Sequence, residues 1–184
     1  MKQKELILLY SGGLDSTVLL ELAMRDGIMP FCLLIDYGQL HKMELTYAEK
    51  MCQNKGLNYE LIHIDLPVKS KLTLTDGSEY EGVSKWHVPS RNLIFIAIAA
   101  SVAESRGTNL IWYGANYDDR EHLFPDCYQE WVFQLNRLLE RNGSVPIRVE
   151  APLLGMEKET VQRLATIFNI NEKEVFSGYG TKER

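Results

Sequence analysis

Short apolar runs alternate with amphipathic stretches along the first third of the chain. Residues 5–10 contain four consecutive apolar side chains, a pattern typical of a strand buried inside a parallel sheet. Residues 15–26 carry apolar side chains at helical spacing, and Gly27 stands where such a helix ends. The pattern then predicts a strand at 31–35, a helix at about 41–54 and a strand at 59–64. This order predicts parallel strands joined by right-handed crossovers.

The rhythm is interrupted at residues 67–89, where glycines and mixed polar residues predict a long loop of the kind that often covers a site. Beyond it the pattern predicts helices at 91–106, about 126–142 and 157–168, strands at 110–114 and 147–150, a polar loop at 117–125 and a further turn at 171–175. The fold class predicted is therefore α/β, a Rossmann-like doubly wound parallel sheet of about five strands with helices on both faces.

Composition narrows the classes of function. The chain has 184 residues, enough for one domain, and its net charge of −5 disfavours a nucleic-acid partner, which normally requires clustered Lys and Arg. The longest apolar stretch, residues 93–102, is about half of a membrane span, and the N-terminal residues lack the pattern of a secretory leader. Cys32, Cys52 and Cys127 form no CxxC pair, so we expect reduced thiols, no disulfide and a cytoplasmic location.

The turn after the first strand carries the clearest chemistry. Its glycines allow a phosphate to approach the backbone, and the helix that follows offers unpaired N–H groups and a positive dipole end. A carboxylate at Asp15 would repel phosphates unless Mg²⁺ lies between them; the alternative is a plain glycine turn capped by Asp15 or Ser11. The pattern is neither a Walker A loop nor GxGxxG. The loop residues expected to bind a nucleotide are Ser11, Gly12, Gly13, Leu14, Asp15, Ser16 and Thr17.

The SGGLDS string at 11–16 resembles the signature of the N-type ATP pyrophosphatases, the PP-loop enzymes that adenylate a substrate oxygen. Four further blocks follow in order: DYGQLH at 36–41, VPSRN at 88–92, FPDC at 124–127, and APL at 151–153 before EKET at 157–160. Together, across about residues 5–180, they resemble the 7-cyano-7-deazaguanine synthase family of queuosine biosynthesis. The resemblance implies an ATP-dependent ligase that adenylates 7-carboxy-7-deazaguanine, forms an amide with ammonia and dehydrates this amide to the nitrile with a second ATP.

The resemblance also assigns roles. Asp15, Arg91 and Lys158 are the catalytic candidates, with Asp15 holding magnesium through ATP. Asp36 and Tyr37, at the carboxyl end of a strand, are expected to meet the nucleotide. The residues expected to bind the substrate are Gln39, His41, Arg91, Asn92, Pro125 and Asp126.

Each of these roles has a plainer alternative. His41 could instead be an ordinary residue at the start of a helix. Arg91 could form a structural ion pair instead of holding a phosphate or carboxylate with its guanidinium. Asp126 could instead cap a helix. Lys158 could be a solvated helix lysine instead of a cation that neutralises developing phosphate charge. Cys127 is better interpreted as a small packing residue than as a nucleophile.

The chain departs from the family pattern at its C-terminal end. The family usually has a zinc site of four cysteines, but Ser177 stands at the first position and the sequence ends at Arg184. Serine is not a structural zinc ligand, so we expect no zinc of this type. Ser90 also stands where the family often has glycine. Two alternatives follow: an amide-forming ligase that stops at 7-amido-7-deazaguanine or another adenylating enzyme, and a non-catalytic module that binds adenine nucleotides.

The expected organisation is a single ATP-pyrophosphatase-type domain over residues 1–184. Within it, residues 1–65 form a nucleotide-binding βαβαβ half, 66–90 a loop or lid, and 91–184 the substrate-side half. The family resemblance implies ATP and Mg²⁺ as cofactors, and proteins of this family often form homodimers. The net charge and the short apolar stretches predict no nucleic-acid or membrane partner.

Overall fold

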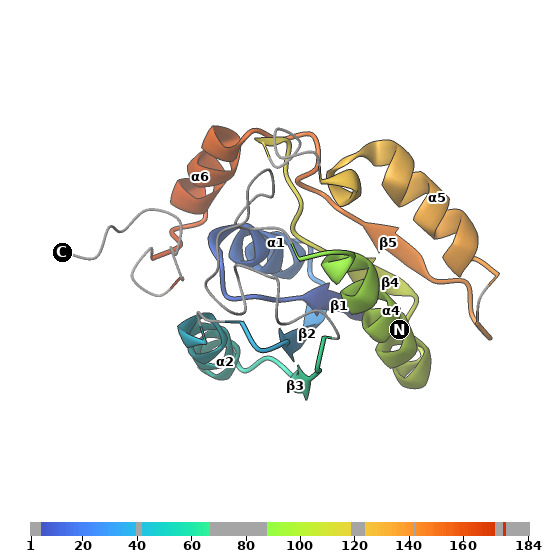
Figure 1. Ribbon diagram of the computed structural model, residues 1–184. Helices are drawn as coiled ribbons and strands as arrows, with labels where there is room; N and C mark the ends of the chain where they lie inside the picture. The colour runs from blue at the N-terminus through green and yellow to red at the C-terminus, as the bar shows by residue number, and fades with distance from the viewer. Residues whose placement is uncertain are drawn as a thin grey trace.

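The computed structural model describes residues 5–39, 42–66, 88–118, 124–141, 143–171 and 175. Its centre is a five-stranded, wholly parallel sheet with the strand order β3-β2-β1-β4-β5 (Figure 1). The strands are β1 (Glu5–Leu9), β2 (Met29–Asp36), β3 (Tyr59–His63), β4 (Leu110–Trp112) and β5 (Arg148–Glu150). The order reverses at β1, so the loops after β1 and β4 diverge there, the place where open α/β sheets bind ligands.

Helices cover both faces of the sheet because the strand side chains alternate between faces. Leu6 and Leu8 of β1 point toward α1 (Leu14–Arg25), α2 (Met43–Lys55) and α6 (Lys158–Ile167). Ile7, between them, points toward α4 (Arg91–Arg106) and α5 (Gln129–Leu139). The three β1 side chains are fully buried, which explains the continuous apolar run in the sequence. The predicted doubly wound α/β fold is thus confirmed.

One predicted helix was wrong in its start. The sequence pattern placed a helix at about 126–142, but a 3-10 turn, η3 (Pro125–Cys127), comes first and α5 begins only at Gln129. Tyr128 between them is extended, with φ −108° and ψ 139°, so the two helical segments are not continuous. The other described elements lie within about two residues of their predicted bounds. Of the predicted loop at 67–89, residues 67–87 lie outside the described residues.

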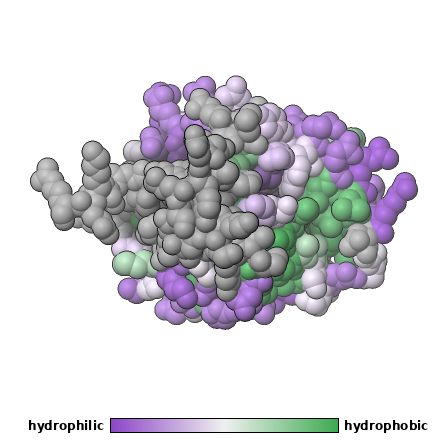
Figure 2. Space-filling model, viewed as in Figure 1, coloured by the Kyte–Doolittle hydropathy of each residue, from purple (hydrophilic) through white to green (hydrophobic). Residues whose placement is uncertain are grey.

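Hydrophobic residues gather on the side of the molecule where α4 and α5 lie (Figure 2). Leu93 of α4 is 43% exposed, and Phe133 and Leu138 of α5 are 53% and 60% exposed. Exposed apolar area of this kind often marks a contact surface. No helix in the described part of the chain is long and apolar enough to cross a membrane.

Candidate functional site

Most of the residues predicted to carry chemistry lie at the carboxyl edge of the sheet. The loop 11–13 follows β1, Asp36 ends β2, the segment 115–118 follows β4, and Lys158 begins the helix after β5. Arg91 begins the crossover helix α4, which returns from this same edge. Parallel topology therefore brings five separate sequence blocks to one place.

The loop after β1 is shaped by its own hydrogen bonds. The Gly13 N–H donates to Ser11 Oγ at 3.3 Å, while the Ser16 and Thr17 hydroxyls donate to the Gly13 carbonyl at 3.0 and 2.9 Å. Gly13 is the N-cap of α1, and no side chain caps this helix, so neither Asp15 nor Ser11 is its cap. Thr17 is fully buried, which places its side chain beneath the loop and not at the open edge.

Asp15 and Lys158 meet across 143 positions of sequence. The Lys158 ammonium donates to Oδ1 of Asp15 at 2.9 Å and to Oδ2 at 2.7 Å. The Lys158 side chain remains 38% exposed and the Asp15 side chain 22% exposed, so a ligand can still reach both. Lys158 is therefore paired with a carboxylate and only partly surrounded by solvent. The sequence prediction named both residues, and the fold places them in direct contact.

Two polar residues of the loop after β4 belong to the same group, although sequence reasoning missed them. Asn116, which is 1% exposed, donates through Nδ2 to Asp15 Oδ2 at 3.3 Å. The backbone N–H of Asp118 donates to Asn116 Oδ1 at 3.1 Å, and the Lys158 backbone N–H donates to Asp118 Oδ2 at 2.9 Å. The signal that could have found them is a run of polar residues directly after a buried strand.

A second cluster follows β2. Asp36 accepts from the Gly38 N–H at 2.9 Å and pairs with His63 at 3.2 Å and Lys42 at 3.6 Å. Burial opposes ionisation of Asp36, but the Gly38 N–H, Lys42 and His63 together lower the pKa of its carboxyl. Asp36 is therefore an anion at neutral pH and suits a hydroxyl or amine donor of a ligand.

Tyr37 and Arg91 connect this cluster to α4. Arg91 donates to Tyr37 Oη at 3.3 Å, and its guanidinium carbon lies 5.7 Å from the centre of the Tyr37 ring. The buried Gln39 accepts from the Tyr37 N–H at 3.0 Å and donates to Glu44 Oε1 at 3.1 Å. Gln39 thus orders the Tyr37 turn from inside, while His41 lies outside the described residues.

Glu44 is an acid that sequence reasoning did not single out. It lies in the first turn of α2, and burial raises its pKa to about 7, although Gln39 and Arg91 oppose the shift. A carboxyl with this pKa can hold or release a proton near neutral pH, beside the residues expected to bind ligands.

Glu44→Gln tests this environment through stability. A raised pKa in the folded state means that Glu44 stabilises the fold fully below its ordinary pKa of 4.5, and that this stability is lost as pH rises toward about 7. The Glu44→Gln variant should therefore gain stability relative to the original chain as pH rises across this window, by about 3 kcal/mol in total. Urea unfolding at a series of pH values measures the difference, with Glu140→Gln on the exposed end of α5 as the control. Parallel pH curves for Glu44→Gln and the original chain would contradict the assignment.

Asn92 and Asp126 form the third part of the edge. Asn92 Nδ2 donates to Asp126 Oδ2, and Tyr113 Oη donates to the Asp126 carbonyl at 2.6 Å. Asp126 therefore does not act as a helix cap through its side chain but pairs with the start of α4. Pro125 is exposed beside it, and Cys127 is 2% exposed within the core, as expected of a packing residue.

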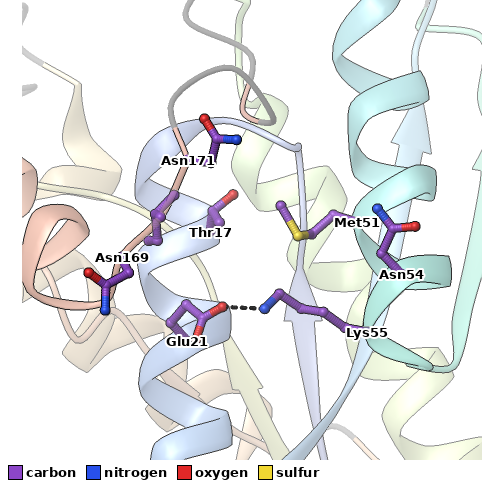
Figure 3. Close-up of a pocket in the computed structure, with 8 residues that line it drawn as sticks. Thr17, Glu21, Met51, Asn54, Lys55, Asn169 and Asn171 are labelled. Carbon is purple, nitrogen blue, oxygen red and sulfur yellow. Dashed lines mark ion pairs between the residues drawn. The ribbon is translucent and has the colours of Figure 1, made fainter.

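Two small hollows lie beside α1 and at the end of β2. One, of about 240 Å³, lies between α1, α2 and residues 169–171, and the ion pair Lys55–Glu21, at 2.5 Å, crosses it (Figure 3). The other, of about 210 Å³, is lined by Asp36, Gly38, Lys42, His63, Ile64 and Asp65. Each is smaller than the roughly 300–1,000 Å³ of an ordinary small-molecule pocket, so neither alone suffices for a nucleotide and a second substrate.

The described part of the chain contains no group of three or more His, Cys, Asp or Glu side chains arranged to hold a metal ion. The three cysteines are buried and form no disulfide. Ser177, at the position of the first family zinc ligand, lies outside the described residues.

Known proteins with similar sequences point in one direction. A family model described as Queuosine biosynthesis protein QueC matches residues 5–184. The 7-cyano-7-deazaguanine synthase of Picrophilus torridus is 32% identical over 191 residues, covering 97% of this chain and 80% of the relative. The enzyme of the same name from Thermoplasma acidophilum is 30% identical over 197 residues, covering 100% of this chain and 82% of the relative.

Solved structures with similar folds are more distant in sequence. The U34-tRNA thiolase NcsA from Methanococcus maripaludis superposes with a TM-score of 0.61 at 18% identity, covering 97% of this chain and 61% of the thiolase. The NH₃-dependent NAD synthetase from Campylobacter jejuni gives 0.56 at 18% identity, covering 99% and 71%. At these identities the likeness shows a shared fold.

Proposed function

This chain belongs to the QueC family of queuosine biosynthesis proteins, and from that premise we propose that it converts 7-carboxy-7-deazaguanine and ammonia to 7-cyano-7-deazaguanine with ATP. It is an ATP-dependent carbon–nitrogen ligase, and we place it in the cytoplasm. The observation that carries the proposal is the contact between Asp15 of the SGGLDS loop and Lys158 at the sheet edge.

The nucleotide fits the groups around this contact. Gly12, Gly13 and Leu14 supply the backbone at the start of α1, where N–H groups and the helix dipole favour phosphate. Ser11 and Ser16 line the loop, and Thr17 supports it from beneath. Asp36 and Tyr37 lie at the neighbouring strand end and are suited to the nucleoside portion.

One acidic side chain in this position fits magnesium, which is typically held by one or two carboxylates together with substrate phosphates. Asp15 would hold the ion, which would supply charge neutralisation along the phosphates. Lys158, released from Asp15, then stands free to contact the pyrophosphate that leaves. Before the nucleotide binds, Asp15 and Lys158 compensate each other's charge. Afterwards the ion would compensate Asp15 and the phosphates would compensate Lys158.

The chemistry requires the substrate carboxylate to become an electrophile. Its oxygen attacks the α-phosphorus of ATP, pyrophosphate leaves, and ammonia then displaces AMP to give the amide. A second ATP activates the amide oxygen, and departure of AMP with that oxygen and loss of two protons leave the nitrile. Arg91, at the start of α4, is placed to hold a carboxylate or phosphate by its planar guanidinium.

The remaining groups are assigned to the substrate. Asn92, Pro125 and Asp126 form the purine-side wall, because a paired amide and carboxylate match the donor and acceptor edge of a deazaguanine. Gln39 would act on the substrate indirectly, through the Tyr37 turn that it orders, and His41 stays a predicted substrate residue outside the described part of the chain. Residues 1–65 then act as the nucleotide half and 91–184 as the substrate half of one domain, with 66–90 between them. The exposed apolar side of α4 and α5 suits a homodimer contact.

The proposal is tested by incubating the purified protein with ATP, magnesium, an ammonium salt and 7-carboxy-7-deazaguanine. We expect a nitrile product with two AMP released per base, measured by mass spectrometry and nucleotide chromatography. An amide with one AMP would overturn the nitrile assignment and leave an amide-forming ligase. Nucleotide binding without any AMP release would overturn the enzyme assignment for this substrate.

A further inference from the structure

Four residues from three separate elements form a closed ring of hydrogen bonds at the sheet edge. Asp15 lies in the first turn of α1, Asn116 and Asp118 follow β4, and Lys158 begins α6. The ring runs from the Lys158 ammonium to Asp15, from Asp15 to the Asn116 amide, from Asn116 to the Asp118 N–H, and from the Asp118 carboxylate to the Lys158 N–H. Each residue therefore has two neighbours in the ring.

The residue types match the bonds they make. Asn116 must donate to a carboxylate and accept from a backbone N–H at once, which an amide can do and a carboxylate cannot. Asn116 is 1% exposed, so water cannot readily replace either of these bonds if it is lost.

Asp118 fixes the start of α6 from outside that helix. The N-cap residue Glu157 makes no side-chain capping bond, and the Asp118 carboxylate instead accepts from the Lys158 N–H at 2.9 Å. A negative group is favoured there by the unpaired N–H groups and the helix dipole. A second bond, from the Tyr117 N–H to the Met156 carbonyl at 2.8 Å, joins the same two segments. The backbone from which the Lys158 side chain extends is thereby held to the loop after β4.

We propose that Asp118 and Asn116 are positioning residues that hold Lys158 and Asp15 in place while the ion pair between them is exchanged for ligand contacts. This inference rests on the proposed function, because the exchange requires a nucleotide at Asp15. The bonds of Asn116 and Asp118 do not involve the Lys158 ammonium, so that ammonium can turn away from Asp15 without breaking them. The ring thus opens only at the contact between the Lys158 ammonium and the Asp15 carboxylate.

A double-mutant cycle tests Asp118 against Lys158. Asp118→Ala should lower kcat for AMP release about 10- to 100-fold in the original chain, since small displacements of a catalytic group have effects of this size. In a Lys158→Met background the same change should cost less than about twofold, because its effect is transmitted through the lysine. Asp118→Asn, which keeps an acceptor oxygen, should recover most of the rate. Asp26→Ala, at the exposed C-cap of α1, is the control.

Nucleotide binding provides a second test that does not depend on turnover. The Asp118→Ala substitution should raise the dissociation constant of a non-hydrolysable ATP analogue, measured with magnesium, about three- to tenfold. The same substitution should leave this constant unchanged when Lys158 has already been replaced by methionine. Asn116→Ala should likewise weaken magnesium-dependent analogue binding, with no further loss in Asp15→Ala. If the fold-changes of the two single substitutions simply multiply in the double variant, the two residues act independently. That result would overturn the positioning role even where the protein releases AMP. Absence of AMP release with coupled binding effects would instead count against the proposed reaction and support the ring.

Discussion

Lys158→Met is expected to lower the rate of AMP release by two to three orders of magnitude. Methionine keeps much of the length of the lysine side chain and removes only its charge. In the folded chain that charge contacts both oxygens of Asp15, and the Lys158 side chain is 38% exposed at the sheet edge. Loss of a cation that stabilises leaving pyrophosphate affects the transition state more than the bound substrate, so kcat should fall more than KM rises.

The matched control is Lys50→Met, which removes an exposed lysine of α2 by the same substitution. Steady-state assays of both variants should leave Lys50→Met within about twofold of the original chain. A Lys158→Met variant that keeps full kcat would show that the contact with Asp15 is purely structural. Urea unfolding of both variants separates this outcome from a loss of folded protein.

The strands of this fold could be predicted because burial on both faces leaves a direct trace in sequence. β1 shows a continuous apolar run, since Leu6 and Leu8 face one helical layer and Ile7 faces the other. The start of α5 could not be predicted in the same way. Cys127 and Leu135 are both buried in one core cluster, so apolar spacing continues across the break at Tyr128. What separates η3 from α5 is a single extended backbone position, for which the pattern gives no signal.

Part of the site could be predicted for a similar reason. Asp15 and Lys158 lie in blocks with a recognisable order, and the topology of a parallel sheet then requires both blocks to reach the same edge. Asn116, Asp118 and Glu44 are different, because their importance comes from what surrounds them. A buried amide between a carboxylate and a backbone N–H, or a carboxyl whose pKa is raised to about 7, is defined by contacts that only the folded chain supplies.

The second large effect is expected at Gly12, where replacement by alanine should destabilise the fold by about 3–5 kcal/mol. Gly12 has φ +79°, and an added Cβ would lie 2.5 Å from the Glu44 carbonyl oxygen and 3.0 Å from the Ala48 nitrogen. Both neighbours are backbone atoms of α2, so neither can move without shifting the helix. The first glycine of the loop is thus required by packing against α2, in addition to any approach of phosphate.

Gly27→Ala separates the two contributions to this cost. Gly27 has φ +71°, close to that of Gly12, but a Cβ there would meet nothing within 4 Å. Its replacement should therefore cost only the strain of a positive φ, about 1–2 kcal/mol. Urea midpoints of the two variants measure the difference, which isolates the collision with α2. Equal destabilisation would mean that α2 yields without cost. A larger loss at Gly12 would instead mean that the position of the loop is set by the helix carrying Glu44, so the phosphate side and the acid of the site move as one unit.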